Sequence, residues 1–102
     1  MHIVTKQTFL NWLETQKKAK KINWDTCHCP MARYAIDNLN AELPRAGSQE
    51  VVDISGEVLY RLSGFTFYNF YQTSIYDFSL PRTYGELASV LKNQIAIANA
   101  HY

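Results

Sequence analysis

The sequence predicts an α+β fold with two N-terminal helices, a four-stranded antiparallel meander and one C-terminal helix. Three observations lead to this class. Apolar residues recur at helical spacing near both ends of the chain. Between the ends, the pattern changes to runs rich in β-branched and aromatic residues, separated by two Ser-Gly dipeptides eight residues apart. Helices grouped outside an antiparallel sheet define the α+β class, and 102 residues are enough for one domain, residues 1–102.

The first predicted helix covers residues 5–21. Thr5 or Thr8 can cap its start, and Phe9 and Leu13 give it a buried face at helical spacing. Four cations at its end suit the negative end of the helix dipole, namely Lys17, Lys18, Lys20 and Lys21. They make the first third of the chain basic, with six Lys or Arg and two acids.

The second predicted helix begins at Pro30, because proline suits the first helical position, where its missing N–H is no loss. Its apolar stripe is Ala32, Ala35, Ile36 and Leu39. Asn40 and Pro44 indicate its end. The following residues, 42–50, are predicted to be a loop.

The predicted meander consists of four runs, residues 51–54, 57–62, 65–71 and 75–80. Ser55-Gly56 and Ser63-Gly64 are predicted to form tight hairpin turns between the first three runs. The fourth run alternates large residues on one face, Tyr76, Phe78 and Leu80.

The last predicted helix begins after Pro81, which ends the preceding strand. Thr83 and Glu86 have the spacing of a capping box, in which each side chain accepts a backbone N–H near the helix start. Its apolar face is Tyr84, Leu87, Ala88, Leu91, Ile95 and Ala98. We expect this face to lie on the sheet.

Both cysteines of the chain lie just before Pro30, with His28 between Cys27 and Cys29. Zinc sites usually draw four ligands from pairs of wider spacing, and the other histidines lie near the termini. We therefore predict no metal and no cofactor. The favoured interpretation is a helix start, with Asp25 or Thr26 accepting free N–H groups and at least one cysteine packed in the core. The alternative is a thiol enzyme or redox sensor at Cys27 and Cys29, since a helix N-terminus lowers a thiol pKa.

Three segments together resemble a family of small bacterial and bacteriophage proteins of uncharacterised function. The segments are "FLNWLE" at residues 9–14, "CHCPMARYAI" at 27–36 and "TYGELASVL" at 83–91, and they cover under half of the chain. The family has an F-x-x-W-L helix, a C-P/L-x-A-x-Y-type helix start and a C-terminal T-[YF]-G-x-L helix. The resemblance implies a small intracellular accessory protein, often phage-encoded, and brings no catalytic residues with it.

Several classes of function are disfavoured by the sequence. It has no Gly-rich phosphate loop and no local pair of acids suited to general acid and base catalysis. No apolar run approaches the ~20 residues of a membrane helix, and the N-terminus has no apolar signal region. We therefore expect a cytoplasmic protein that is not an enzyme and has no membrane partner.

The most unusual feature is the aromatic content of residues 65–78, which hold seven of the 14 aromatic residues. One sheet face cannot bury all of them, so the segment is either a core covered on both faces or a partner-binding surface. The leading hypothesis is a module that binds a host protein or itself through Tyr68, Tyr71 and Tyr76. A phage-encoded inhibitor of a host defence protein is its most specific form. An alternative is a nucleic-acid-associated protein that uses Lys17, Lys18, Lys20 and Lys21.

Overall fold

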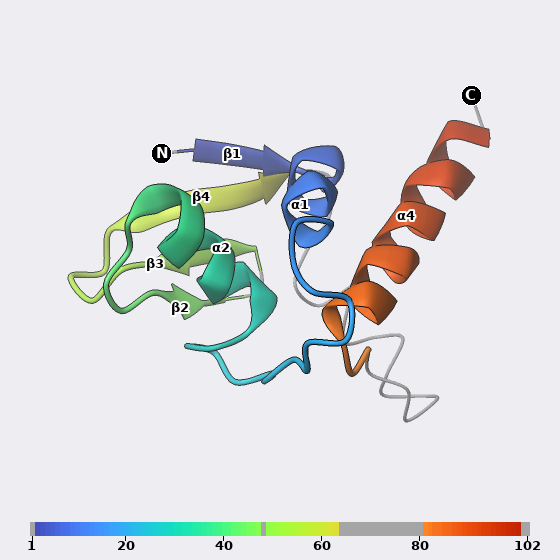
Figure 1. Ribbon diagram of the computed structural model, residues 1–102. Helices are drawn as coiled ribbons and strands as arrows, with labels where there is room; N and C mark the ends of the chain where they lie inside the picture. Colours follow the sequence, from blue (N-terminus) through green and yellow to red (C-terminus); the bar gives the residue numbers. More distant parts are fainter. Residues whose placement is uncertain (1, 48, 64–80, 101–102) are drawn as a thin grey trace.

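The computed structural model describes residues 2–47, 49–63 and 81–100 (Figure 1). Within these ranges the fold has the predicted α+β class. The elements, in chain order, are β1 (His2–Thr5), α1 (Lys6–Leu13), α2 (Pro30–Leu39), β2 (Arg45–Ala46), β3 (Glu50–Val52), β4 (Val58–Ser63) and α4 (Tyr84–Ala100). Of these helices, none is long and apolar enough to cross a membrane.

The predicted antiparallel meander is wrong, because the sheet is mixed. Its strand order is β1-β4-β3-β2, and β1 runs parallel to β4, with His2 opposite Tyr60 and Thr5 opposite Ser63. The parallel pair joins the start of the chain to its middle, so no turn sequence reveals it. The predicted strands at 65–71 and 75–80, and Gly64 of the second Ser-Gly turn, lie outside the described residues.

The predicted loop at residues 42–50 instead contains β2 and the first residue of β3. The two strands pair antiparallel, with Ala46 opposite Val51, and the N–H of Gly47 donates to the carbonyl of Glu50 at 2.8 Å. A strand of two residues is too short to show an alternating pattern, which is why the sequence does not indicate it.

The first Ser-Gly turn is confirmed between β3 and β4. Gly56 has a φ of +87°, a conformation that favours glycine. The Asp53 carboxylate accepts the N–H groups of Ser55 and Glu57, at 2.8 and 3.2 Å. Asp53 therefore organises the hairpin turn rather than carrying only a solvated charge.

The first helix begins as predicted but is much shorter. The Thr5 hydroxyl caps α1 by accepting the N–H of Thr8 at 3.1 Å, and Phe9 and Leu13 are buried. The helix ends at Leu13, so the lysine segment, Lys17–Lys21, is not helical. The prediction of a helix to residue 21 is wrong.

The second helix begins at Pro30, as predicted, and ends at Leu39, with Asn40 as its C-cap at a φ of 55°. Ala32 and Ala35 are buried, but Ile36 is 37% exposed, so its place in the predicted stripe is wrong. Met31 and Tyr34 are buried instead. The buried face of α2 is therefore rotated from the predicted stripe so that it includes Met31 and Tyr34, and Ile36 lies at its edge.

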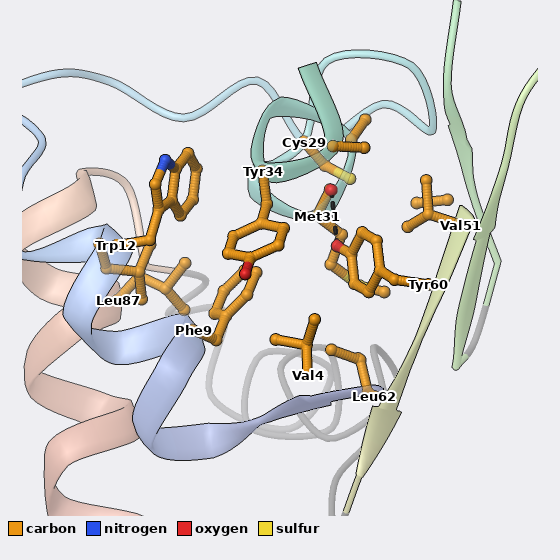
Figure 2. Close-up of a cluster of buried hydrophobic side chains, with 14 of the residues drawn as sticks. Val4, Phe9, Trp12, Cys29, Met31, Tyr34, Val51, Tyr60, Leu62 and Leu87 are labelled. Atoms are coloured by element: carbon orange, nitrogen blue, oxygen red, sulfur yellow. Dashed lines mark hydrogen bonds between the residues drawn. The ribbon is translucent and has the colours of Figure 1, made fainter. Parts of the chain in front are cut away.

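One hydrophobic core joins the sheet to the helices, with aromatic rings at its centre (Figure 2). Tyr34 lies among the rings of Phe9, Trp12 and Tyr60, at centroid distances of 5.6, 5.5 and 5.2 Å. The Tyr60 hydroxyl donates to the carbonyl of Met31 at 2.6 Å. This hydrogen bond satisfies the polar end of a ring whose body is fully buried.

The last helix packs against α1, which lies between it and the sheet (Figure 1). Tyr84, Leu87 and Leu91 are buried, as the pattern predicts. Among the described elements, the main partner of this face is α1. The predicted strands at 65–71 and 75–80, which belong to the sheet expected here, lie outside the described residues. Ala98, the last residue of the predicted stripe, has its side chain outside the described residues.

Candidate functional site

The lysine segment forms a short antiparallel ladder with the start of α4. The N–H groups of Tyr84 and Gly85 donate to the carbonyls of Lys20 and Lys18, each at 3.0 Å. The ladder also includes the hydrogen bond from Ile22 N to Arg82 O at 2.8 Å and the pairing of Lys21 with Thr83. Helix N-termini have N–H groups without intrahelical partners, and here the lysine carbonyls accept them. Because these carbonyls point at α4, α1 cannot continue through this segment.

Half of the predicted capping box at the start of α4 is present. The N–H of Glu86 donates to the Thr83 hydroxyl at 3.2 Å, but the Glu86 carboxylate accepts the N–H of Arg82, one residue before the cap, at 2.6 Å. The Lys20 ammonium lies 5.3 Å from the ring centroid of Tyr84, within the range of a cation–π interaction. Local caps and the ladder therefore fix the lysine segment and α4 together.

Gly85 is the point of closest approach between the two segments. A β-carbon built on Gly85 would lie 3.0 Å from both the carbonyl oxygen and the Cβ of Lys18. The Gly85 φ is outside the left-handed region. Glycine is thus required here for space rather than for conformation.

We expect Gly85→Ala to lower the free energy of unfolding by about 1–2 kcal/mol, the cost of overpacking less the better helix propensity of alanine. Urea unfolding followed by circular dichroism measures the change. Gly47→Ala is the matched control, since its added β-carbon would meet its nearest atom, Glu50 O, at 3.4 Å. A Gly85→Ala protein at least as stable as the parent would show that the Lys18 backbone can shift away from the added methyl group at little cost in free energy.

The ladder forms one end of a hollow between α1 and α4, which we call the α1–α4 groove. Its volume is about 530 Å³. Its floor, the buried or half-buried lining residues, consists of Leu10, Leu13, Thr83, Gly85 and Ala88. Its rim, the exposed lining residues, consists of Glu14, Lys18, Ala19, Glu86, Ser89 and Lys92. An apolar floor with a few polar groups around it is typical of a binding site.

The charged groups on the rim are mostly uncommitted. Within the described residues, neither the Lys18 and Lys92 ammonium groups nor the Glu14 carboxylate forms an ion pair. The Glu86 carboxylate accepts the N–H of Arg82, which leaves it negatively charged. The described rim therefore carries two cations and two anions that can contact a ligand in the groove.

The cysteine segment leads into α2, as the favoured interpretation predicts, but the N-cap residue is Cys29 and no side chain caps the helix. The Asp25 carboxylate instead stabilises the turn before it. Asp25 accepts the N–H groups of Cys27 and His28 at 2.8 and 2.7 Å, and its carboxylate lies 2.8 Å from the His28 Nδ1. The hydrogen bond to His28 lowers the pKa of the Asp25 carboxyl. Cys29 is fully buried, which confirms that one cysteine packs in the core, whereas Cys27 is exposed.

The cysteines do not form a disulfide. Burial raises the pKa of the Cys29 thiol, which disfavours the thiolate needed by a nucleophile. Cys27 has a hydrogen-bond contact with the Thr26 hydroxyl at 3.9 Å, and the described contacts do not join its sulfur to His28. In the described part of the chain, no group of three His, Cys, Asp or Glu side chains is placed to hold a metal ion.

The sequence-predicted binding residues fall into two sets. Of the lysines, Lys17, Lys18 and Lys21 are exposed and Lys20 is half-buried, and Lys18 alone lines the groove. The tyrosine set, Tyr68, Tyr71 and Tyr76, lies outside the described residues. The groove itself is not among the sequence-predicted sites, although the small residues Gly85, Ala88 and Ser89 near the start of the helix are a signal for close approach.

The described geometry therefore offers a hydrophobic groove with free charges rather than an assembled set of reacting groups. The lysine segment contributes to it through both its backbone and one side chain. No known protein family, curated protein sequence or solved structure matches the chain.

Proposed function

We propose that the chain is a small, non-enzymatic protein-binding module whose partner docks in the α1–α4 groove. The observation that carries this proposal is the groove's combination of an apolar floor with uncommitted charges on its rim. Buried apolar contacts supply most of the affinity of a protein interface, and charges at the rim select the partner. A groove between two helices is a common receptor for a short partner segment.

The most specific form of the proposal is a phage-encoded inhibitor of a host defence protein, acting in the cytoplasm. It rests on the resemblance of three segments to small bacterial and phage proteins. Self-association through the same groove is the other protein-binding form. Both forms place the function on the surface formed by α1, the lysine segment and α4.

Nucleic-acid binding and thiol chemistry have less support. The exposed lysines lie beside the Glu14 and Glu86 carboxylates, and like charges would repel phosphate groups there. The thiol alternative would depend on Cys27, because Cys29 is buried with a raised thiol pKa.

Filling the groove tests the proposal. We expect Ser89→Trp to abolish capture of the partner from lysate of the native host, because the indole occupies space that the partner needs. Ser89 is exposed, so the variant is expected to fold. The captured proteins are identified by mass spectrometry, and the oligomeric state is measured by light scattering.

Ala96→Trp is the matched control, because Ala96 is exposed on the same helix and does not line the groove. A specific partner, or a dimer, should persist with Ala96→Trp and disappear with Ser89→Trp. A partner that both variants retain would contradict the assignment of the groove.

A further inference from the structure

We infer that Cys27 and Cys29 form a redox-sensitive switch, in which a disulfide between them closes only when the start of α2 opens. The inference goes beyond the proposed function, because it concerns what controls the folded state rather than what the chain binds, and it makes neither thiol a catalyst. Two observations carry it, namely the opposite burial of the two thiols and the attachment of Cys29 to the core.

One thiol of the pair is exposed and the other is enclosed, although only His28 separates them in the chain. Cys27 is exposed, and its sulfur contacts the Thr26 hydroxyl at 3.9 Å. Cys29 has no exposed surface. A disulfide needs its two β-carbons within about 3.5–4.5 Å and its sulfurs bonded at about 2 Å. An exposed sulfur and an enclosed one do not meet this requirement, so the backbone around Cys29 has to move before the bond can form.

Such a movement would disturb the start of α2. Cys29 is the N-cap residue of this helix and belongs to the same core as Val51 and Tyr60 (Figure 2). Its N–H donates to the carbonyl of Asp25 at 3.0 Å, and its carbonyl accepts the N–H of Arg33 at 3.0 Å. Moving the thiol outward would break these bonds and leave unfilled space in the core. The fold therefore favours the two thiols over the disulfide.

The oxidant that suits an exposed thiol is a small-molecule disulfide such as oxidised glutathione. The Cys27 thiol loses its proton, and the thiolate attacks one sulfur of the oxidant, so that a mixed disulfide forms and one glutathione thiolate leaves. The Cys29 thiolate then attacks the Cys27 sulfur of the mixed disulfide, and the second glutathione thiolate leaves. Two protein thiols are oxidised, one small disulfide is reduced, and the two leaving thiolates take up the two protons.

The two steps depend on the fold to different degrees. The first step needs only the exposed Cys27. In the second step Cys29 has to leave the core, where burial raises the pKa of its thiol, so the step waits for local opening of α2. A disulfide that closes so short a loop restrains the unfolded chain less than one that closes a long loop. The oxidised chain should therefore be less stable than the reduced chain.

Oxidised glutathione added to the reduced full-length chain, followed by intact-mass spectrometry, tests the order of the steps. We expect the parent to pass through a mixed disulfide to an intramolecular disulfide. Urea below the unfolding transition should speed the second step more than the first. Cys29→Ala should accumulate the mixed disulfide. Cys27→Ser, a change at an exposed position, should stay unmodified in native buffer and react once unfolded.

The coupling to the fold is measured by the equilibrium constant for forming the disulfide with glutathione. The matched reference is a synthetic peptide of residues 24–32 in the same buffer, which has both thiols but no core. We expect the constant to be at least tenfold smaller for the folded chain, equivalent to about 30 mV in reduction potential. The oxidised chain should also unfold at a lower urea concentration than the reduced chain, and amide hydrogen exchange should quicken first in α2.

Three results would overturn the inference. A parent chain that stops at the mixed disulfide would leave Cys27 as an exposed thiol without a partner thiol. Equal constants for the folded chain and the peptide would show that the fold does not oppose the disulfide, and equal stability of the oxidised and reduced chains would show that closure does not open α2. None of these measurements involves a binding partner, so their outcome is independent of the test of the α1–α4 groove.

Discussion

Replacing Phe9 with alanine is expected to lower the free energy of unfolding by about 3–5 kcal/mol, the range for a buried phenylalanine. Phe9 is fully buried and its ring centroid lies 5.6 Å from those of both Trp12 and Tyr34. Truncation would remove these ring contacts and leave a cavity where α1 meets α2 (Figure 2). A domain of this size is generally stable by only about 5–15 kcal/mol, so the loss is a large fraction of the total.

Chemical unfolding followed by tryptophan fluorescence measures this change, because Trp12 is in contact with Phe9. Asn11→Ala is the control on the same helix, since Asn11 is exposed and should shift the unfolding free energy by about 0.5 kcal/mol or less. Phe9→Leu should lose much less than Phe9→Ala, because it leaves a smaller cavity. Equal stability of Phe9→Ala and the parent would mean that the aromatic cluster is not the centre of the core.

The features that the sequence predicts correctly depend on local chemistry. Thr5 and Thr83 cap helices through backbone N–H groups three residues away. Pro30 begins a helix because of its fixed φ, and Gly56 makes a hairpin turn because of its positive φ. In each case the signal and the structure it specifies lie within a few residues of one another.

The features that were missed depend on partners far away in the chain. The pairing of β1 with β4 is set by tertiary packing, and the four residues of β1 carry no turn or period that indicates it. The lysine segment has good helix formers, but its carbonyls accept N–H groups from α4. This tertiary bonding overrides local helix propensity, which is worth only tenths of a kcal/mol per residue.

The candidate site has the same division between local and distant causes. The sequence indicated the lysines as a charged surface, and Lys18 does line the groove. Their backbone role in the ladder and the presence of Lys18 and Lys92 around one groove both depend on how α4 docks. The docking requires a glycine at position 85, because a β-carbon there would lie 3.0 Å from Lys18, a residue distant in the sequence.

Leu91→Ala is expected to lower the free energy of unfolding by about 2–5 kcal/mol, the range for a buried leucine. Leu91 is fully buried one turn after Leu87, which is also fully buried. Because α1 is the main neighbour of α4 among the described elements, we expect the cavity to open between these two helices. The loss of stability should therefore be largest in α4, which forms one wall of the α1–α4 groove.

This location gives the Leu91 variant a second readout. Amide hydrogen exchange should quicken along α4 more than in β3 and β4, because the cavity weakens the helix contact and leaves the strand pairing intact. Asn93→Ala, an exposed position on the same helix, should leave both the exchange rates and the unfolding free energy nearly unchanged. Faster exchange that is uniform over the whole chain would show that α4 and the sheet unfold as one unit, and an unchanged free energy would place Leu91 outside the core.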